Sequence, residues 1–387
     1  MLLNRFIMKS FPMSASINAS IYTLPLKSNK ALPFALKNSS MDVGRFERLP
    51  KWLNCIPLVA QWLWLGLCYR SFTLPSTANP YITSGGMVGE GKLEYFDSMG
   101  ALAKKYTAEY IAIRVVRNLT ASELSQRMQD NNLNFPIIAK PNLGWCGYGV
   151  RLVSNLAELE KYLQNFPKGE MLVLQRYLPE SGEAGLFYAR NPGDDTGRII
   201  GITLRYYPKV TGDGKHSIRE LIAADKRLHR VEHSPLHQPG FNPDYIPSDG
   251  EVVRLATIGS TRVGGLYCDG SNHITIELDK AVDSIAKDMK EFYMGRFDVR
   301  FESLEQLKSG TGFTIMEVNG SGSEAIHAWD PKYSIVESYS IIFAKQRLLF
   351  AISEASRRNG HKPISMWELT KLHLYQQKLI KLYPLSN

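Results

Sequence analysis

The residues of this chain best suited to chemistry are three oxygen-bearing side chains, Asp298, Glu317 and Asn319. They lie in two segments, 295–301 and 313–319, in which apolar and polar residues alternate as they do in half-buried strands. If the two strands pair as a hairpin, the three side chains converge on one patch. Hard Mg2+ ions prefer carboxylate and amide oxygens. The pattern therefore predicts a metal site, and an amphipathic hairpin with a solvated acidic face is the simpler alternative.

Alternation along each strand also predicts which residues share a face. Glu317 and Asn319 fall on one face, whereas Met316 and Val318 point to the other. In the first strand, the three charged residues Arg296, Asp298 and Arg300 share a face, and the three apolar residues Phe297, Val299 and Phe301 turn toward a core.

A second candidate site is the segment that begins with Lys140 at the end of an apolar run. A lysine fixed by a buried strand can meet a phosphate as a point charge. Gly144, Gly147 and Gly149 follow it, and glycines let a loop bring its N–H groups close to anionic oxygens. The loop has neither the spacing of a Walker A motif nor that of a Rossmann fingerprint, so an ordinary turn is the alternative.

The next strand, 171–177, runs into an exposed connection that contains Gln175, Arg176, Tyr177 and Leu178. Backbone groups of such a connection can bind an adenine edge, and the nearby carboxylate of Glu183 can accept hydrogen bonds from ribose hydroxyls. A generic strand exit would look the same.

Composition places the chain among globular proteins: 387 residues, of which 44% are hydrophobic, are enough for two or more packed domains. The formal charge of +9 owes five units to residues 1–41, which contain no acidic residue. The remainder is too weakly basic to indicate a nucleic-acid groove. The four cysteines form no CxxC pair, which favours a reducing, cytoplasmic setting.

Two N-terminal segments stand apart from this pattern. Residues 1–40 resemble a disordered leader or an extension from an upstream start codon. Residues 52–69 lack charge and are flanked by cations. They predict a helix that is buried or covered by a partner, lies in a membrane interface, or spans a membrane.

The remaining periodicity predicts an α+β protein. Helices are expected near 94–105, 121–130, 155–165, 217–227 and 280–292, and strands at 135–140, 150–153, 171–177, 184–189 and 199–207.

Taken in chain order, these segments resemble the ATP-grasp superfamily over about residues 100–345. Gly295-Arg296-Phe297-Asp298-Val299 and Glu317-Val318-Asn319 are close to patterns of D-alanine:D-alanine ligases, and residues 211–221 are similar to cyanophycin synthetase. The match is nearest to uncharacterised bacterial proteins with the pattern that this chain carries at Asn319–Pro331.

The resemblance implies an ATP-grasp fold, in which two α+β subdomains clasp ATP, with a short helical N-terminal region and a helical C-terminal extension. The implied segments are a leader 1–40, an N-terminal region 41–130, a small subdomain 131–182, a large subdomain 183–333 and an extension 334–387. Lys140, the glycine loop, residues 175–178 and Glu183 would bind ATP. Asp298, Glu317 and Asn319 would hold two Mg2+ ions, with Mn2+ as an alternative.

The implied activity is an ATP-dependent carboxylate-amine ligase that works through an acyl phosphate, with Arg296 holding the reacting intermediate. Small-molecule or peptide carboxylates and amines are its expected partners, and the sequence leaves a homodimer open. The substrate loop differs from that of known ligases: Ser321, Ser323, Glu324 and His327 are the residues that could line it. Lys104 and Lys105 are the two candidates for a second ATP-binding lysine. The alternatives are a phosphotransferase without ligation and a membrane-associated nucleotide-binding scaffold.

Overall fold

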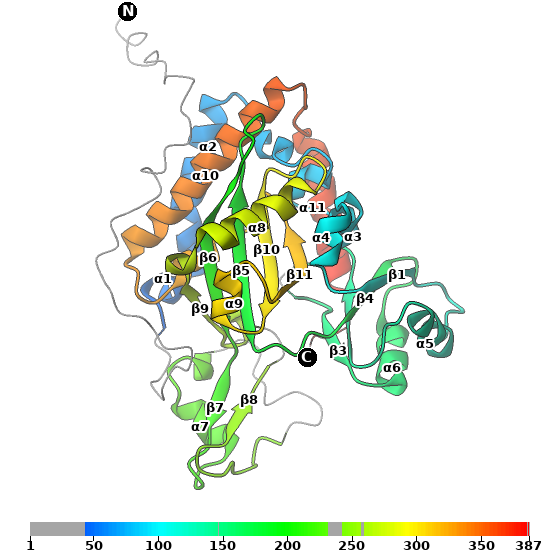
Figure 1. The fold of residues 1–387 in the computed structure, drawn as a ribbon. Coiled ribbons are helices and arrows are strands. Elements are labelled where there is room, and N and C mark those ends of the chain that lie inside the picture. Colours follow the sequence, from blue (N-terminus) through cyan, green and yellow to red (C-terminus); the bar gives the residue numbers. More distant parts are fainter. Residues whose placement is uncertain (1–42, 146, 231–241, 257–258, 385, 387) are drawn as a thin grey trace, which may run out of the picture. The chain divides into compact units, whose positions relative to one another are not determined.

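The computed structural model describes residues 43–145, 147–230, 242–256, 259–384 and 386. The predicted leader, residues 1–40, and Cys146 lie outside the described residues. The described residues form three antiparallel sheets with helices packed around them, so the predicted α+β class is confirmed (Figure 1).

The first sheet has four strands in the order β1-β4-β2-β3. Its strands are β1 (Tyr110–Arg114), β2 (Ile137–Pro141), β3 (Arg151–Val153) and β4 (Met171–Arg176), and it packs with α5 (Ala121–Asp130) and α6 (Leu156–Asn165). Thr120 and Glu123 cap α5 reciprocally, as their spacing indicates. The edge strand β1 lies outside the expected strands. It pairs with β4, so the small sheet draws on residues before 131.

The second sheet has five strands in the order β11-β10-β5-β6-β9. They are β5 (Gly182–Ala189), β6 (Arg198–Tyr206), β9 (Leu266–Asp269), β10 (Met294–Phe301) and β11 (Phe313–Asn319). Figure 1 shows α8 (Ile276–Lys287) lying across this sheet, and the largest apolar core forms between them. The short helix α9 (Leu304–Lys308) connects β10 to β11.

The expected helical stretch 94–105 forms two helices, α3 (Lys92–Ser98) and α4 (Ala101–Lys105). The break falls at Gly100, whose N–H donates to the carbonyl of Asp288 at 2.7 Å. The Asp288 carboxylate accepts the N–H of Ala103 at 2.8 Å and so satisfies a donor in the first turn of α4. This contact is long-range, which is why local periodicity does not reveal the break.

A small outlying unit consists of the two-stranded sheet β7 (Lys209–Thr211) and β8 (Val252–Arg254) with α7 (Ile218–Ala224). Val210, Ile218 and Ile222 contribute to its own apolar cluster. Capping by Ser217 and Glu220 starts α7.

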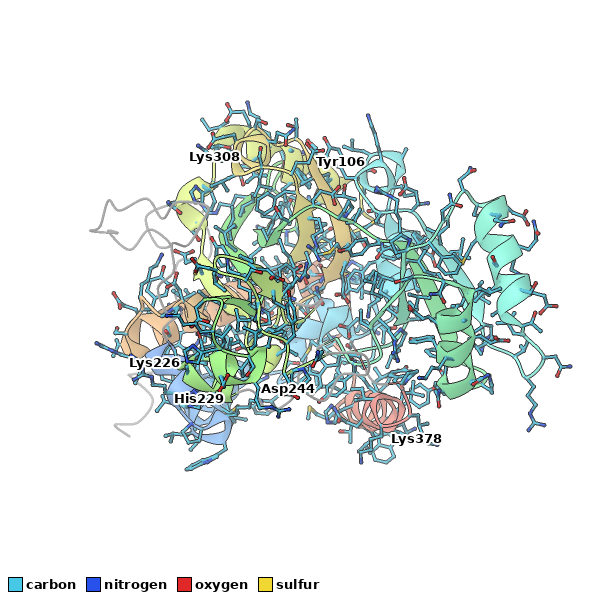
Figure 2. The ribbon with its side chains drawn as sticks, turned by 90° about the horizontal axis from the view of Figure 1, so that it is seen from below. Tyr106, Lys226, His229, Asp244, Lys308 and Lys378 are labelled. Atoms are coloured by element: carbon cyan, nitrogen blue, oxygen red, sulfur yellow. The ribbon has the colours of Figure 1, made fainter. Side chains whose placement is uncertain are left out.

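Four further helices come from the two ends of the described chain: α1 (Arg45–Arg48), α2 (Lys51–Cys68), α10 (Ile335–Arg358) and α11 (Met366–Ile380). The helix expected at 52–69 is α2, and it packs against α10, with Trp62 edge-on to Phe350 at 5.1 Å between ring centroids. Lys378 marks α11 in Figure 2, where this helix is seen along its axis. Among the described residues, no helix is both long and apolar enough to cross a membrane.

Candidate active site between the two larger sheets

The hairpin of β10 and β11 brings the three predicted oxygen ligands together. In its register Asp298 lies opposite Glu317, and Arg296 lies opposite Asn319. The Asn319 amide donates to Asp298 Oδ2 at 3.0 Å. The predicted strand pairing is therefore confirmed, and the three side chains form one cluster. Their role as metal ligands stays a prediction.

A β-bulge at Met316 interrupts the alternation of β11. Asp298 pairs with Glu317 but the next residue, Val299, pairs with Ile315, so Met316 is the extra residue. Ile315 and Val318 both enter the core, while Met316 is only partly buried. The expectation that Met316 and Val318 share the face opposite Glu317 rests on strict alternation, which the bulge at Met316 interrupts.

Lys140 reaches this cluster from the end of β2 in the four-stranded sheet. Its ammonium donates to the Met316 carbonyl at 2.9 Å and to Gln175 Oε1 at 2.6 Å. The side chain is buried, and burial lowers the pKa of Lys140 to about 8 although Glu317 opposes that shift. A lysine from one sheet is thus fixed beside the acidic strands of the other.

Lys92, at the start of α3, is a site residue that the sequence analysis missed. Its ammonium lies 3.1 Å from Glu317 Oε1. Lys104 and Lys105, the two candidates for a second lysine, are exposed on α4 instead. The only local signal for Lys92 is its place directly after a glycine-rich stretch, because its proximity to Glu317 comes from tertiary packing.

Two lysines act on the charge of Glu317: Lys92 pairs with its carboxylate at 3.1 Å, and Lys140 lies close enough to favour the ionised form. Burial tends to raise the pKa of Glu317, but Lys92 and Lys140 hold it below its usual range. The Glu317 side chain remains 34% exposed, against 4% for Asp298. Glu317 is consequently the carboxylate of the cluster that is more open to a ligand.

Asp298 is held by two arginines. Arg296 contacts both of its oxygens, at 2.7 and 3.0 Å, and Arg205 donates to Oδ1 at 2.7 Å. Burial favours the neutral acid, yet the two guanidinium groups hold the pKa of Asp298 below its usual range.

Arg205 extends this network to Glu183, the predicted ribose-binding acid. Arg205 lies 3.1 Å from Glu183 Oε1, and Arg300 lies 3.6 Å from Oε2. Tyr207 also donates to Glu183. The structure places the Glu183 carboxylate in a buried ion-pair network, so its ribose-binding role stays a prediction.

The glycine loop follows Lys140 directly. Gly147 and Gly149 have positive φ angles of 75° and 74°, which side-chain-bearing residues rarely adopt. A Cβ atom on Gly144 would lie 3.3 Å from Lys92 Nζ, so the loop passes close to the lysine of α3. Of the predicted adenine linker, Gln175 and Leu178 are buried, Tyr177 is partly buried, and Arg176 forms an exposed ion pair with Glu109.

The segment after β11 is held from three sides. Ser321 N–H donates to the Gly85 carbonyl at 3.2 Å, and the ammonium of Lys345 on α10 donates to the carbonyls of Ser321 and Ser323. Arg296 donates to the Glu324 carbonyl at 3.3 Å. Within the described part of the chain, the hydroxyls of Ser321 and Ser323 are buried and form no hydrogen bond.

His327 lies in the short helix Ile326–Trp329 and is buried. Its ring packs edge-on to Phe187 at 5.1 Å between centroids and covers Gly201. Burial lowers the pKa of His327 to about 4, so the imidazole is neutral at pH 7 and only weakly basic. These contacts favour a structural histidine over a general base.

Comparison with known proteins gives distant relatives. The glutathione biosynthesis bifunctional protein GshAB of Streptococcus thermophilus is 25% identical over 215 residues, which are 50% of this chain and 28% of that protein. The GshAB of Streptococcus agalactiae is 24% identical over 289 residues, 67% of this chain and 36% of that protein. The chain thus spans about a third of the length of these curated relatives. No protein-family profile matches the chain.

The predicted resemblance to the ATP-grasp superfamily is confirmed. Solved structures similar to the chain include a bifunctional glutathione synthetase from Pasteurella multocida, with 17% identity, a TM-score of 0.37, and coverage of 66% of this chain and 35% of that one. Another is a D-alanine:D-alanine ligase from Bacillus anthracis, with 17% identity, a TM-score of 0.37, and coverage of 70% and 67%. The roles of individual site residues in this chain stay predictions.

Proposed function

We propose that this chain is an ATP-dependent carboxylate-amine ligase. The observation that carries the proposal is the contact of Lys140 Nζ with the Met316 carbonyl, 2.9 Å long. It joins a lysine suited to phosphate to the strand that bears Glu317 and Asn319. Lys92 adds a second ammonium group, 3.1 Å from the carboxylate of Glu317. Cations and hard oxygen ligands in one place are what transfer of a phosphoryl group from ATP requires.

In the proposed reaction, a carboxylate oxygen of the substrate attacks the γ-phosphorus of ATP, and ADP leaves. The amine nitrogen then attacks the carbonyl carbon of the acyl phosphate, loses a proton and expels phosphate. Lys140 and Lys92 bind and orient the phosphates. Arg296 stabilises negative charge on the carbonyl oxygen during the second step. Closure of the glycine loop excludes water, which would otherwise hydrolyse the acyl phosphate.

The acidic cluster fits a divalent cation by its chemistry. Asp298, Glu317 and Asn319 offer two carboxylates and one amide oxygen, and the 3.0 Å contact between Asn319 and Asp298 keeps them adjacent. Glu317 is the more exposed of the two acids. Asp298 would have to give up contacts with Arg205 or Arg296 to bind a cation. Bound Mg2+, one ion or two, would offset charge on the phosphates; Mn2+ suits the same ligands.

Release of ADP from ATP and Mg2+ tests the proposal. We expect turnover only when a carboxylate and an amine are both supplied, so amino acids, short peptides and other carboxylates should be screened in pairs. ADP and phosphate should appear in equal amounts with an amide product, and EDTA should abolish both. Absence of ADP release across the screen, with no nucleotide binding, would contradict the assignment.

The alternative reaction is phosphoryl transfer without ligation. The hydroxyls of Ser321 and Ser323 form no hydrogen bond among the described residues, and a substrate hydroxyl or carboxylate could each serve as their partner. Mass spectrometry of the product separates the two reactions, because ligation forms an amide and the alternative forms a phosphoester.

We also propose that α2 contacts an anionic membrane surface. One face of α2 exposes a series of apolar side chains, including Trp52 at 69% and Trp64 at 66%, and that stretch carries no acidic residue. Arg48, Lys51 and Arg70 flank the face and match the charge of acidic lipids. The same surface would also suit the non-enzymatic scaffold or a homodimer.

Flotation with vesicles distinguishes these uses of α2. We expect the protein to float with phosphatidylglycerol vesicles and less with phosphatidylcholine, and Trp52→Ser with Trp64→Ser to reduce flotation. Trp367→Ser on α11, where the side chain is 69% exposed, is the matched control. Protein that never floats but sediments as a dimer would reassign the face to self-association.

A further inference from the structure

Side chains from α11 and the segment after it donate hydrogen bonds to main-chain carbonyls of the glycine loop. The Tyr383 hydroxyl donates to the Leu143 carbonyl at 2.6 Å. Two other donors, Gln376 and Ser386, reach the carbonyls of Gly144 at 3.3 Å and Gly147 at 2.7 Å, respectively. Three carbonyls of one short loop are therefore bound by a single distant stretch of chain.

Tyr383 is itself fixed by packing. Its ring stacks on Phe166 with 5.6 Å between centroids, and a Cβ atom on Gly149 would lie 3.0 Å from the Tyr383 Cβ. Leu379, at the end of α11, is buried, and Gln376 is 5% exposed. The donors thus come from an ordered surface against which the loop rests.

The opposite side of the loop faces the candidate active site. A Cβ atom on Gly144 would lie 3.3 Å from Lys92 Nζ, which pairs with Glu317. In a trans peptide, the C=O of one residue and the N–H of the next point in opposite directions. Since the carbonyls of Leu143 and Gly144 point to the C-terminal segment, the N–H groups of Gly144 and Trp145 point away from it.

We propose that Tyr383 and Gln376 are positioning residues for the phosphate-binding glycine loop, and that they act by holding its carbonyls away from the nucleotide. A carbonyl turned toward the site would repel phosphate oxygens, whereas an N–H group attracts them. The inference rests on the proposed function, because it takes the loop's ligand to be the phosphates of ATP. The C-terminal segment, which carries none of the predicted site residues, then tunes nucleotide binding.

Tyr383→Phe tests this proposal because it removes the hydroxyl and keeps the stacked ring. Titration calorimetry with Mg2+ and the non-hydrolysable analogue AMP-PNP should show binding about 2- to 10-fold weaker, the loss expected for one hydrogen bond. Affinity for AMP, which lacks the β- and γ-phosphates, should not change. Hydrogen exchange of residues 143–149 should become faster in the free protein.

Tyr375→Phe is the matched control. Tyr375 also lies on α11, and its hydroxyl donates to Glu170 at 2.8 Å, away from the loop. The Tyr375→Phe variant should have the AMP-PNP affinity of the wild type and the same rate of hydrogen exchange in the glycine loop. Equal behaviour of the two variants, or equal weakening of AMP and AMP-PNP by Tyr383→Phe, would overturn the proposal. Wild-type protein that binds no AMP-PNP would instead refute the proposed function, and exchange of the loop would then decide whether Tyr383 positions it.

Discussion

Protein that carries Asp298→Asn together with Glu317→Gln is expected to lose Mg2+-dependent ADP release. The two substitutions keep side-chain size but remove both negative charges from the predicted metal site. Offsetting charge at a transferring phosphoryl group contributes several kcal/mol, and each 1.36 kcal/mol is tenfold in rate, so we expect a loss of at least about 100-fold. Coupled-enzyme assay of ADP across a Mg2+ titration measures it.

Asp298 also neutralises Arg205 and Arg296, so replacing it could reduce activity by destabilising the fold. Glu317→Gln by itself resolves this, because Glu317 is partly exposed and its partners are lysines. It should retain cooperative thermal unfolding and still slow ADP release. The control is Glu302→Gln, an exposed acid in the connection between β10 and β11, which should behave as wild type. Unchanged turnover of the double variant would remove the acidic hairpin from the mechanism.

The second large effect concerns stability. Arg205→Met is expected to lower the free energy of unfolding by about 3–5 kcal/mol, the usual cost of removing one partner from a buried ion pair. Arg205 is the cation shared by Asp298 and Glu183, whose side chains are 4% and 6% exposed. Methionine fills similar space but leaves both carboxylates with less compensation. Chemical denaturation at pH 7 measures the change.

Arg176→Met serves as the comparison for that measurement. Arg176 pairs with Glu109 on the surface, where both side chains are well exposed, so the expected change is within about 0.5 kcal/mol. If Arg205→Met were as mild as Arg176→Met, then Arg296, Arg300 and Tyr207 would suffice to hold the two buried acids, and Arg205 would have another role.

Much of the fold follows from patterns that are local in the sequence. The hairpin of β10 and β11 is predictable because polar and apolar residues alternate across 295–301, and the pairing follows from the short connection. Thr120 with Glu123 marks the start of α5 in the same way, since both partners of that capping box lie within one turn.

The features that escaped prediction depend on distant contacts. β1 has only five residues and acquires its identity by pairing with β4, some 60 residues later. Lys92 enters the site because α3 packs beside the hairpin, and its partner Glu317 is far away in the chain. The cations that hold Glu183 come from β6 and β10, and its ribose-binding role stays a prediction. No local pattern encodes such pairings.

The bulge in β11 has a consequence for which mutations the site can tolerate. Lys140 is anchored there by the main-chain oxygen of residue 316, which every amino acid supplies. A change of side chain at 316 would therefore leave the anchor in place. Deletion of that residue would leave Ile315 opposite Val299 and Glu317 opposite Asp298 in an unbroken ladder, but it would remove the carbonyl that binds Lys140. What position 316 must preserve is therefore a main-chain oxygen outside the ladder, and its side chain is free to vary.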